Sequence, residues 1–580
     1  MKDIDPVMLE VMKNAFFSVT EEMGIALVRT AYSTNVKDRK DYSCALYTPD
    51  GRLIAQGLHL PSMMGAMVWT IKAALAAIPP DSLKPGDAIL FNDPYIGNTH
   101  APDLVLTTPV FYQGKLMAFV ASMAHHIDVG GSVPGSLSTR ATEVFHEGLR
   151  LPPIVAMRDG EFDPTVLTVI QANSRTPYEV QGDLKAQAGA NRIGVQRFLD
   201  LCERHGADVV ESAIEELDAY CERRMRAEMR DIPQGVFEFE DHLDGDGFTD
   251  DPIKLKVAIH TKGDRLVFDW TGTAPQVRGS VNCQKALVLG CIYYIMKSIT
   301  DPTIPPNEGT FRPIELIAPP GTVVNATFPA PTGMGGIVLG PRIIDTILGA
   351  LHKCVPDRVC AASVGGQNLL SLGGRDPATG DYFSNVETYG GGYGATSGQD
   401  GEDAIQAHRT NSANCPCEVI EATFPMLVDR YGIVPDSEGP GSFRGGLGVT
   451  REYTFKSTAV FTFATDRAVL DPWGLDGGMS PGKGVYRVVH ADGTAEDMGG
   501  KCQRDVEAGA RFVLRTRGGG GWGDPFQRDP EKIRWDVVEG LLSLERARDV
   551  YGVVIDPASM AVDGAGTDEM RADRSRRSDR

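Results

Sequence analysis

The 580-residue sequence has no run of 18 uncharged apolar residues, about the length that a membrane-spanning helix needs. Its N-terminus, MKDIDPVMLEVMKNAFF, has acids and helical spacing where a signal peptide has a basic start and an apolar run. Cysteine is sparse, because only ten residues are spread along the chain, which excludes the dense disulfide framework of a small secreted domain. These absences predict a cytoplasmic protein with reduced thiols.

Basic residues are also fewer than acidic ones. The chain has 57 Lys and Arg against 77 Asp and Glu, a formal net charge of -20 at pH 7. Nucleic acid and an anionic membrane would both be repelled by such a surface, so neither is expected as a partner. An anionic substrate would need a local positive site.

Apolar residues and turn formers are plentiful. A hydrophobic content of 42% over this length supports a large interior, and the usual domain size suggests about three or four modules. The 65 Gly and 37 Pro fall in short clusters between apolar runs rather than in low-complexity tracts. The composition is typical of a loop-rich globular enzyme.

The spacing of apolar residues predicts where helices and strands form. Three- and four-residue spacing over 6–31 predicts an opening amphipathic helix, and a second helical region is expected over 165–231. Runs such as CALYTPDGRLIAQG and KLKVAIHTKGDRLVFDWTG predict strands joined by tight turns. No regular strand-helix-strand repeat is visible, so we expect a multi-lobed α+β fold with mixed or antiparallel sheets and flanking helices.

The same patterns predict four regions along the chain. These are an N-terminal α/β region with the metal site (1–235), a central α+β region with glycine-rich loops (236–425), a C-terminal β-rich region (426–560) and a disordered tail (561–580). The tail, ending in DGAGTDEMRADRSRRSDR, has almost no apolar residues.

Histidines and acids occur together in three segments near strand ends: KDRKDYSCA, FNDPYIGNTHAPD and MAHHIDVGG. Imidazole and carboxylate groups bind divalent ions, and a catalytic site keeps a position open for water or substrate. A strand would point His125 and His126 to opposite faces, so at most one ligates directly, while the other can join Asp128 behind it. Spacing alone does not choose between them, and histidines satisfied at strand ends would give the same pattern.

Long blocks of sequence resemble one known family. In order, they are KDYSCALYTPDGRLIAQG, FNDPYIGNTHAPDLVLTTPVF, AHHIDVGGSVPGS, HEGLRLPP, NSRTPYEVQGDLKAQ, VFDWTGTAPQVRGSVN, DSEGPGSFRGGLG and GGGGWGDPFQRDP. Over residues 5–556 the chain resembles the hydantoinase B/oxoprolinase family. That family includes the B-type subunits of ATP-dependent N-methylhydantoinases, the corresponding half of 5-oxoprolinase, similar lactamases, and alpha-type subunits of acetone and acetophenone carboxylases.

The resemblance implies a two-step reaction. A kinase-like A-type subunit, using ATP and Mg²⁺, would phosphorylate an amide or enolate oxygen, and this B-type chain would complete the hydrolysis of a cyclic amide at one divalent metal ion (Zn, Mn or Fe). A hetero-oligomer such as A2B2 is expected. The alternatives are the alpha-type subunit of an ATP-dependent ketone carboxylase, with a ketone as substrate, and a non-catalytic structural subunit.

Matching motif to motif, the resemblance implies Asp41, His100 and His125 as metal ligands. A water on the ion would attack the activated carbon, and Asp128, Asp103 or His126 would take its proton. We assign catalytic roles to Asp128 and His126.

Two loops depart from the family pattern. Met63 stands where relatives often have a histidine, and PTGMGGIVLGPRIID replaces a more polar loop, which leaves the substrate open.

Several glycine-rich segments are candidate phosphate sites. The segment GGMSPGKG (477–484) ends in Gly484, where a P-loop requires Ser or Thr, so the sequence shows no nucleotide motif and ATP chemistry requires a partner. The segments YGGGYGA (389–395), SFRGGLG (442–448) and RGGGGWGD (517–524) are either tight turns or backbone N–H donors to a phosphorylated intermediate.

Overall fold

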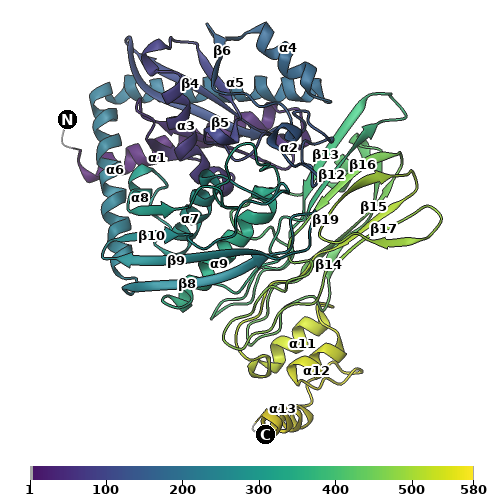
Figure 1. Ribbon diagram of the computed structural model, residues 1–580. Coiled ribbons are helices and arrows are strands. Elements are labelled where there is room, and N and C mark those ends of the chain that lie inside the picture. The colour runs from purple at the N-terminus through teal and green to yellow at the C-terminus, as the bar shows by residue number, and fades with distance from the viewer. Residues whose placement is uncertain (1–3, 579–580) are drawn as a thin grey trace.

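The computed structural model describes residues 4–578, and the side chains of residues 62, 64 and 573–578 lie outside that description. Within 4–578 no helix is long and apolar enough to cross a membrane. The multi-lobed α+β class is confirmed, because helices flank several mostly antiparallel sheets (Figure 1).

The opening helix α1 (Pro6–Thr30) forms where apolar spacing predicts it. Asp5 caps its start by accepting hydrogen bonds from two backbone N–H groups, both at 2.9 Å. Its buried face packs on the long helix α5 (Pro177–His205), where Phe16 stacks on Phe198 with ring centroids 6.3 Å apart. The helical region expected over 165–231 is also present, as α4 (Pro164–Asn173), α5 and α6 (Ala207–Arg230).

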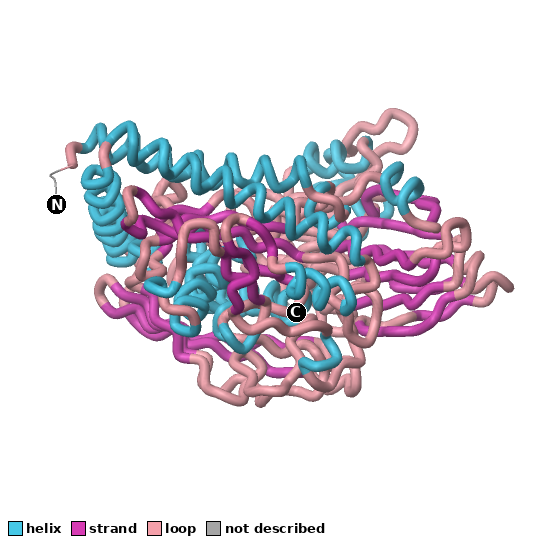
Figure 2. The backbone as a smooth tube through the Cα atoms, turned by 90° about the horizontal axis from the view of Figure 1, so that it is seen from above, coloured by secondary structure: helices cyan, strands magenta, loops and turns pink. Residues whose placement is uncertain are grey.

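A seven-stranded antiparallel sheet forms the N-terminal region, with its long helices lying across one face (Figure 2). Gln187 on α5 fixes this contact, because its Nε2 donates to the carbonyl oxygens of Leu104 (3.0 Å) and Ser122 (3.1 Å) on adjacent strands. In spatial order the strands are β2 (Leu53–Gln56), β1 (Tyr42–Tyr47), β5 (Lys115–His125), β4 (Asp103–Tyr112), β3 (Ala88–Phe91), β6 (Ile154–Arg158) and β7 (Glu161–Phe162).

A smaller sheet follows in the centre of the chain. Burial alternates along β9 (Ile253–Lys262), so that Leu255, Val257 and Ile259 face α9 (Gly340–Leu351) while their neighbours along the strand face outward. The strands are β11 (Ile314–Ile317), β10 (Arg265–Asp269), β9 (Ile253–Lys262) and β8 (Gly235–Leu243).

Two further sheets form the C-terminal part of the molecule. Aromatic side chains fill the space between them, with Phe461 and Phe512 ring centroids 4.8 Å apart. One sheet contains β13 (Tyr382–Thr388), β12 (Leu369–Arg375), β16 (Ala459–Ala464) and β19 (Lys501–Val506); the other contains β14 (Met426–Val434), β15 (Gly448–Phe455), β20 (Arg511–Arg515), β17 (Val485–Val489) and β18 (Ala495–Asp497).

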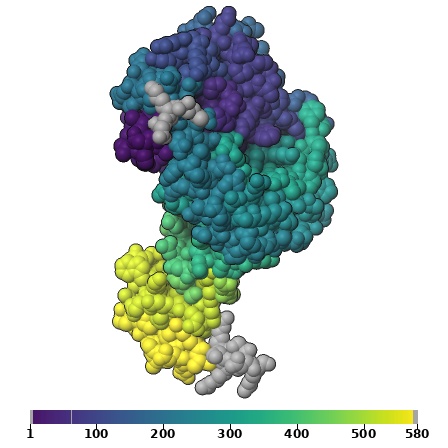
Figure 3. Space-filling model, turned by 90° about the vertical axis from the view of Figure 1, so that its left-hand side faces the viewer, coloured from purple at the N-terminus to yellow at the C-terminus, as the bar shows by residue number. Residues whose placement is uncertain are grey.

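The remaining helices connect or cover these sheets. They are α2 (Thr34–Lys37), α3 (Met64–Ala77), α7 (Lys285–Ile299), α8 (Glu308–Phe311), α10 (Cys417–Thr423), α11 (Pro530–Val538), α12 (Leu544–Tyr551) and α13 (Gly564–Ser578). The last three form a lobe that projects from the body (Figure 3).

Two details differ from the regions expected along the chain. Strands β12 and β13 lie within 236–425 but pair into a sheet with β16 and β19 of the C-terminal region. Where a disordered tail was expected from 561, helix α13 is present, and Thr567 on it accepts a hydrogen bond from the backbone N–H of Val554. Residues 579–580 of that tail lie outside the described residues.

Candidate metal centre

Three neighbouring strands bring the predicted ligands to one end of the seven-stranded sheet. The last residue of β5, His125, stands opposite the first residue of β4, Asp103, in the strand register. Asp41 immediately precedes β1, the other neighbour of β5, and its carbonyl oxygen accepts a hydrogen bond from the His125 backbone N–H at 3.0 Å. His100 lies in the loop that leads into β4. Strand pairing therefore joins segments that are far apart in sequence.

Three of these side chains form a compact buried cluster. His100 Nε2 lies 3.1 Å from Asp103 Oδ2, and His125 Nδ1 lies 3.2 Å from both Asp103 Oδ1 and His100 Nε2. One ligand atom from each residue lies within 4.8 Å of the others. The structure thus brings His100, Asp103 and His125 together as a group that could hold a metal ion, and Asp41 lies outside this group.

The cluster fits a divalent ion. An ion with bonds of about 2.1 Å in tetrahedral geometry separates its ligand atoms by roughly 3.4 Å, close to the spacing found here. His125 Nδ1 faces the other two ligand atoms, and its Nε2 is buried without a hydrogen-bond partner among the described residues. Two imidazoles and one carboxylate are a usual donor set for a catalytic ion, and they leave a position open.

The charged groups of the cluster shift one another's pKa values strongly. Burial alone would lower the pKa of His100, but the Asp103 carboxylate outweighs burial and raises that pKa to about 9; the Asp41 charge adds to the effect. Burial would raise the pKa of Asp103, but the two histidines hold it well below its ordinary value. Without an ion, His100 therefore carries a proton at neutral pH, and a metal ion would have to displace it.

A carboxylate behind the cluster orients His100. The Gly333 carbonyl oxygen accepts from His100 Nδ1 at 3.1 Å, which leaves Nε2 facing the cluster. Glu147 fixes that carbonyl by accepting hydrogen bonds from the backbone N–H groups of Gly333 (2.7 Å) and Thr332 (3.1 Å). Burial raises the pKa of Glu147 to about 7.

A cavity of about 50 Å³ opens beside the three ligands. Asp41 contributes to its wall, so this predicted ligand lies in the site although it is outside the three-residue cluster. Met63 also lines the cavity. The other lining residues include Arg39, Thr99, Leu137, Leu287, Gly336, Gln367, Thr388, Arg409 and Thr410.

The two residues assigned catalytic roles from the sequence lie behind the site and are not among those that line the cavity. His126 points to the opposite face of β5, where its Nε2 lies 2.9 Å from Gln187 Oε1. Asp128 is fully buried, and its carboxylate accepts hydrogen bonds from the backbone N–H groups of Gly130, Gly135 and Arg175 and from the Arg175 guanidinium. Both side chains hold the loop after β5 in place.

The glycine-rich loops form backbone hydrogen bonds with one another. The Gly392 N–H donates to the Arg517 carbonyl oxygen at 3.1 Å, the Gly446 N–H to Tyr393 at 2.8 Å, and the Gly519 N–H to Gly446 at 3.0 Å. A Cβ at Gly392 would lie 1.9 Å from the Gly446 carbonyl oxygen. These three loops therefore pack backbone against backbone, as turns.

Sequence reasoning missed two contributors to the site. The His100–Asp103 spacing was a visible signal for Asp103, which was expected only as a base. Glu147 lies in the family-like block HEGLRLPP, but nothing local indicates that its partner is a loop 185 residues later.

Comparison with known proteins identifies the family of the chain. The family model described as hydantoinase B/oxoprolinase matches residues 5–525. The chain belongs to this family. It is 34% identical to the B-type subunit of a putative D-/L-hydantoinase of Pseudomonas sp., over 98% of both chains. It is also 35% identical to a 5-oxoprolinase of Pestalotiopsis fici, over 90% of this chain but only 42% of that protein.

Solved structures share the fold. The crystal structure of ATP-dependent caprolactamase from Pseudomonas jessenii matches with a TM-score of 0.90 and 28% identity, over 98% of this chain and all of that one. Nucleotide-free acetone carboxylase matches with a TM-score of 0.88 over 99% of this chain and 83% of that chain, but at 20% identity it shows the fold alone.

Proposed function

We propose that this chain is the B-type catalytic subunit of an ATP-dependent cyclic-amide hydrolase, which hydrolyses a ring that an A-type, kinase-like subunit has phosphorylated. The observation that carries the proposal is the buried His100–Asp103–His125 cluster beside a cavity, in a family whose solved neighbours include a caprolactamase. The relative from Pseudomonas sp., a B-type hydantoinase chain, supports an A-type partner.

His100, Asp103 and His125 would hold one divalent ion, and Asp41 would add a carboxylate from the cavity wall. Such an ion lowers the pKa of a water to near neutrality and so supplies a nucleophile. The chain itself orients His100 through Gly333, excludes bulk water by burying the cluster, and offers carboxylates that can accept the water's proton.

The reaction balances with two waters. The first adds to the carbon of the phosphorylated amide; the ring C–N bond then breaks as nitrogen takes a proton, giving an acyl phosphate and an amine. The second water releases inorganic phosphate and leaves a carboxylate. Phosphorylation is needed because an unactivated amide is a poor electrophile with a poor leaving group.

The test is coupled turnover of the chain with its A-type partner on hydantoin, 5-oxoproline and lactams without bicarbonate. We expect a ring-opened product from the natural chain, loss of bound metal and of product in His100→Ala, and neither loss in the control His205→Ala at the end of α5. ATP hydrolysis and ring opening by metal-free His100→Ala would contradict the proposal.

A ketone carboxylase is the second candidate, favoured by the fold match to acetone carboxylase. The same assay with acetone or acetophenone plus bicarbonate separates the two. Product that forms only with ketone and bicarbonate would replace the hydrolase proposal.

A further inference from the structure

Buried arginines in the described part of the chain are paired with acids, with two exceptions. Arg39 and Arg409 have no carboxylate oxygen within 4.0 Å among the described residues, although they are only 1% and 2% exposed, and both line the cavity of the metal centre. A buried cation without a counter-charge is costly, so a pair of them in one cavity indicates an anion that belongs there. The paired arginines are Arg342, Arg444, Arg451, Arg467, Arg517 and Arg528.

Arg409 is the less satisfied of the two. Its Nη2 donates to the Gly336 carbonyl oxygen, whereas Nε and Nη1 are buried and have no hydrogen-bond partner within residues 4–578. Arg39 donates from Nη1 to Val386 O at 2.7 Å and to Asn35 Oδ1 at 3.1 Å and from Nη2 to Thr388 Oγ1 at 2.7 Å, so that among its nitrogens only Nε lacks a partner in residues 4–578. Arg409 thus offers free donors, and Arg39 adds positive charge.

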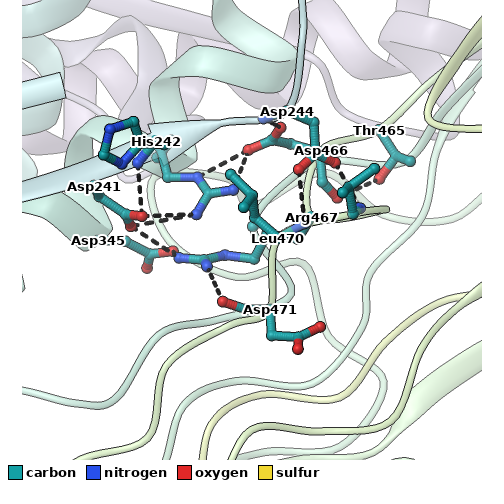
Figure 4. A network of polar contacts seen from close by, with 12 residues as sticks. Asp241, His242, Asp244, Asp345, Thr465, Asp466, Arg467, Leu470 and Asp471 are labelled. Atoms are coloured by element: carbon teal, nitrogen blue, oxygen red, sulfur yellow. Dashed lines mark hydrogen bonds and ion pairs between the residues drawn. The ribbon is translucent and has the colours of Figure 1, made fainter. Parts of the chain in front are cut away.

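The fold prepares the position of the Arg409 guanidinium. Gly340 makes room for it, because a Cβ there would lie 2.6 Å from Arg409 Nε. The preceding residue, His408, is held by Tyr393, whose hydroxyl lies 3.2 Å from Nδ1, and by Asp345, whose Oδ1 lies 3.3 Å from Nε2. Asp345 itself belongs to the ion network of Figure 4. The donors are therefore in place before a ligand arrives, which reduces the entropy lost on binding.

We propose that Arg409, assisted by the charge of Arg39, forms an oxyanion subsite that binds the phosphoryl group of the activated substrate in the cavity of the His100–Asp103–His125 cluster. The planar guanidinium matches two phosphate oxygens at once. It supplies the local positive site that an anionic substrate needs in a chain of net charge -20. The substrate assignment rests on the proposed function; the anion site itself does not.

The experiment measures binding of inorganic phosphate, and of acetate as a carboxylate, to the metal-loaded chain without its partner, by calorimetry. The variants are Arg409→Gln, Arg409→Lys, the surface control Arg192→Gln on α5, and His100→Ala, with metal content determined for each. We expect phosphate to bind more tightly than acetate, with a loss of tenfold to about a hundredfold in Arg409→Gln, a smaller loss in Arg409→Lys and none in Arg192→Gln.

A second readout separates this role from a structural one. Because Arg409→Gln removes an unpaired buried cation, it should raise the melting temperature without phosphate, and phosphate should stabilise the natural chain more than the variant. A lowered melting temperature or failure to fold would assign Arg409 to the scaffold and overturn the proposal.

Three binding results would also overturn the proposal. Two of them are that phosphate does not bind, or that acetate binds as tightly as phosphate. The third is that His100→Ala loses phosphate binding while Arg409→Gln keeps it in full, which would assign the anion to the metal alone. Failure of ring opening in the coupled assay, with phosphate binding as expected, would instead contradict the hydrolase proposal and leave the anion site standing.

Discussion

At the scale of single residues, we expect the centre to depend on Asp103, which contacts both histidines, more than on Asp41, which lies in the cavity wall. Each oxygen of Asp103 faces a different imidazole, so one carboxylate sets the geometry of the whole cluster. The two acids differ in geometry and should therefore differ in their effect on metal binding.

Replacing these acids one at a time tests that difference. Asp103→Asn removes the charge at the centre of the cluster, and we expect metal affinity to fall by more than the roughly hundredfold that loss of a supporting partner costs. Asp41→Asn should lower the metal affinity by only about tenfold. Metal-binding isotherms of both variants, with Asp497→Asn as a surface control, measure this, and equal losses would place Asp41 in the ligand set on the same footing as Asp103.

Glu147 gives a pH-dependent prediction. Burial raises its pKa to about 7 from an ordinary value of 4.5, so its protonated form stabilises the fold below pH 4.5, and that contribution is lost as pH rises through 7. Relative to Glu147→Gln, the free energy of unfolding of the metal-free chain should fall by up to about 3 kcal/mol across this range. Urea unfolding at several pH values measures it, and a difference that does not change with pH would show that Glu147 keeps its ordinary pKa.

Sequence reasoning reached part of this site. The motifs lead to His100 and His125, and strand alternation predicts that His125 and His126 face opposite sides, as they do. The partner of Glu147 and the isolation of Arg409 from acids depend on contacts across hundreds of residues, which no local pattern encodes.

At the scale of elements, the sequence predicts strands and helices well but not which strands pair. Alternation and turn residues predict strands such as β9 and β10, yet only the register places Asp103 on β4 opposite His125 on β5. Helix α5 fixes the strands that carry the site, since Gln187 bonds to two strand carbonyls and to His126 from the opposite face of the sheet.

Gln187→Ala should therefore destabilise the N-terminal region. It leaves buried carbonyl groups and a buried imidazole without partners, which costs about 1–3 kcal/mol. Chemical denaturation measures this effect, and the matched control Gln196→Ala, exposed on the same helix, should stay within about 0.5 kcal/mol of the natural chain. A change in Gln187→Ala as small as in the control would show that α5 is held by its apolar contacts alone.

At the scale of the whole molecule, an ion network joins the central sheet, α9 and the C-terminal sheets (Figure 4). Arg342 on α9 donates from Nε to Asp466 Oδ2 at 2.8 Å and lies 3.3 Å from Asp241 on β8. Arg467 donates to Asp345 at 2.7 Å and to Asp241 at 3.2 Å. The regions predicted along the sequence are thus tied together by buried charges whose pairing the sequence does not reveal.

Asp466→Asn tests whether these regions open together. The change weakens the pairing of Arg342, which is fully buried, and breaking a buried pair costs about 3–5 kcal/mol. Because Arg342 and Arg467 share Asp241, the loss of stability should extend beyond the substituted residue. Amide hydrogen exchange should become faster in β8 and α9 as well as at the end of β16. Faster exchange confined to the end of β16 would show that the central and C-terminal sheets are stabilised independently, and Asp497→Asn, in an exposed pair, should leave all three segments unchanged.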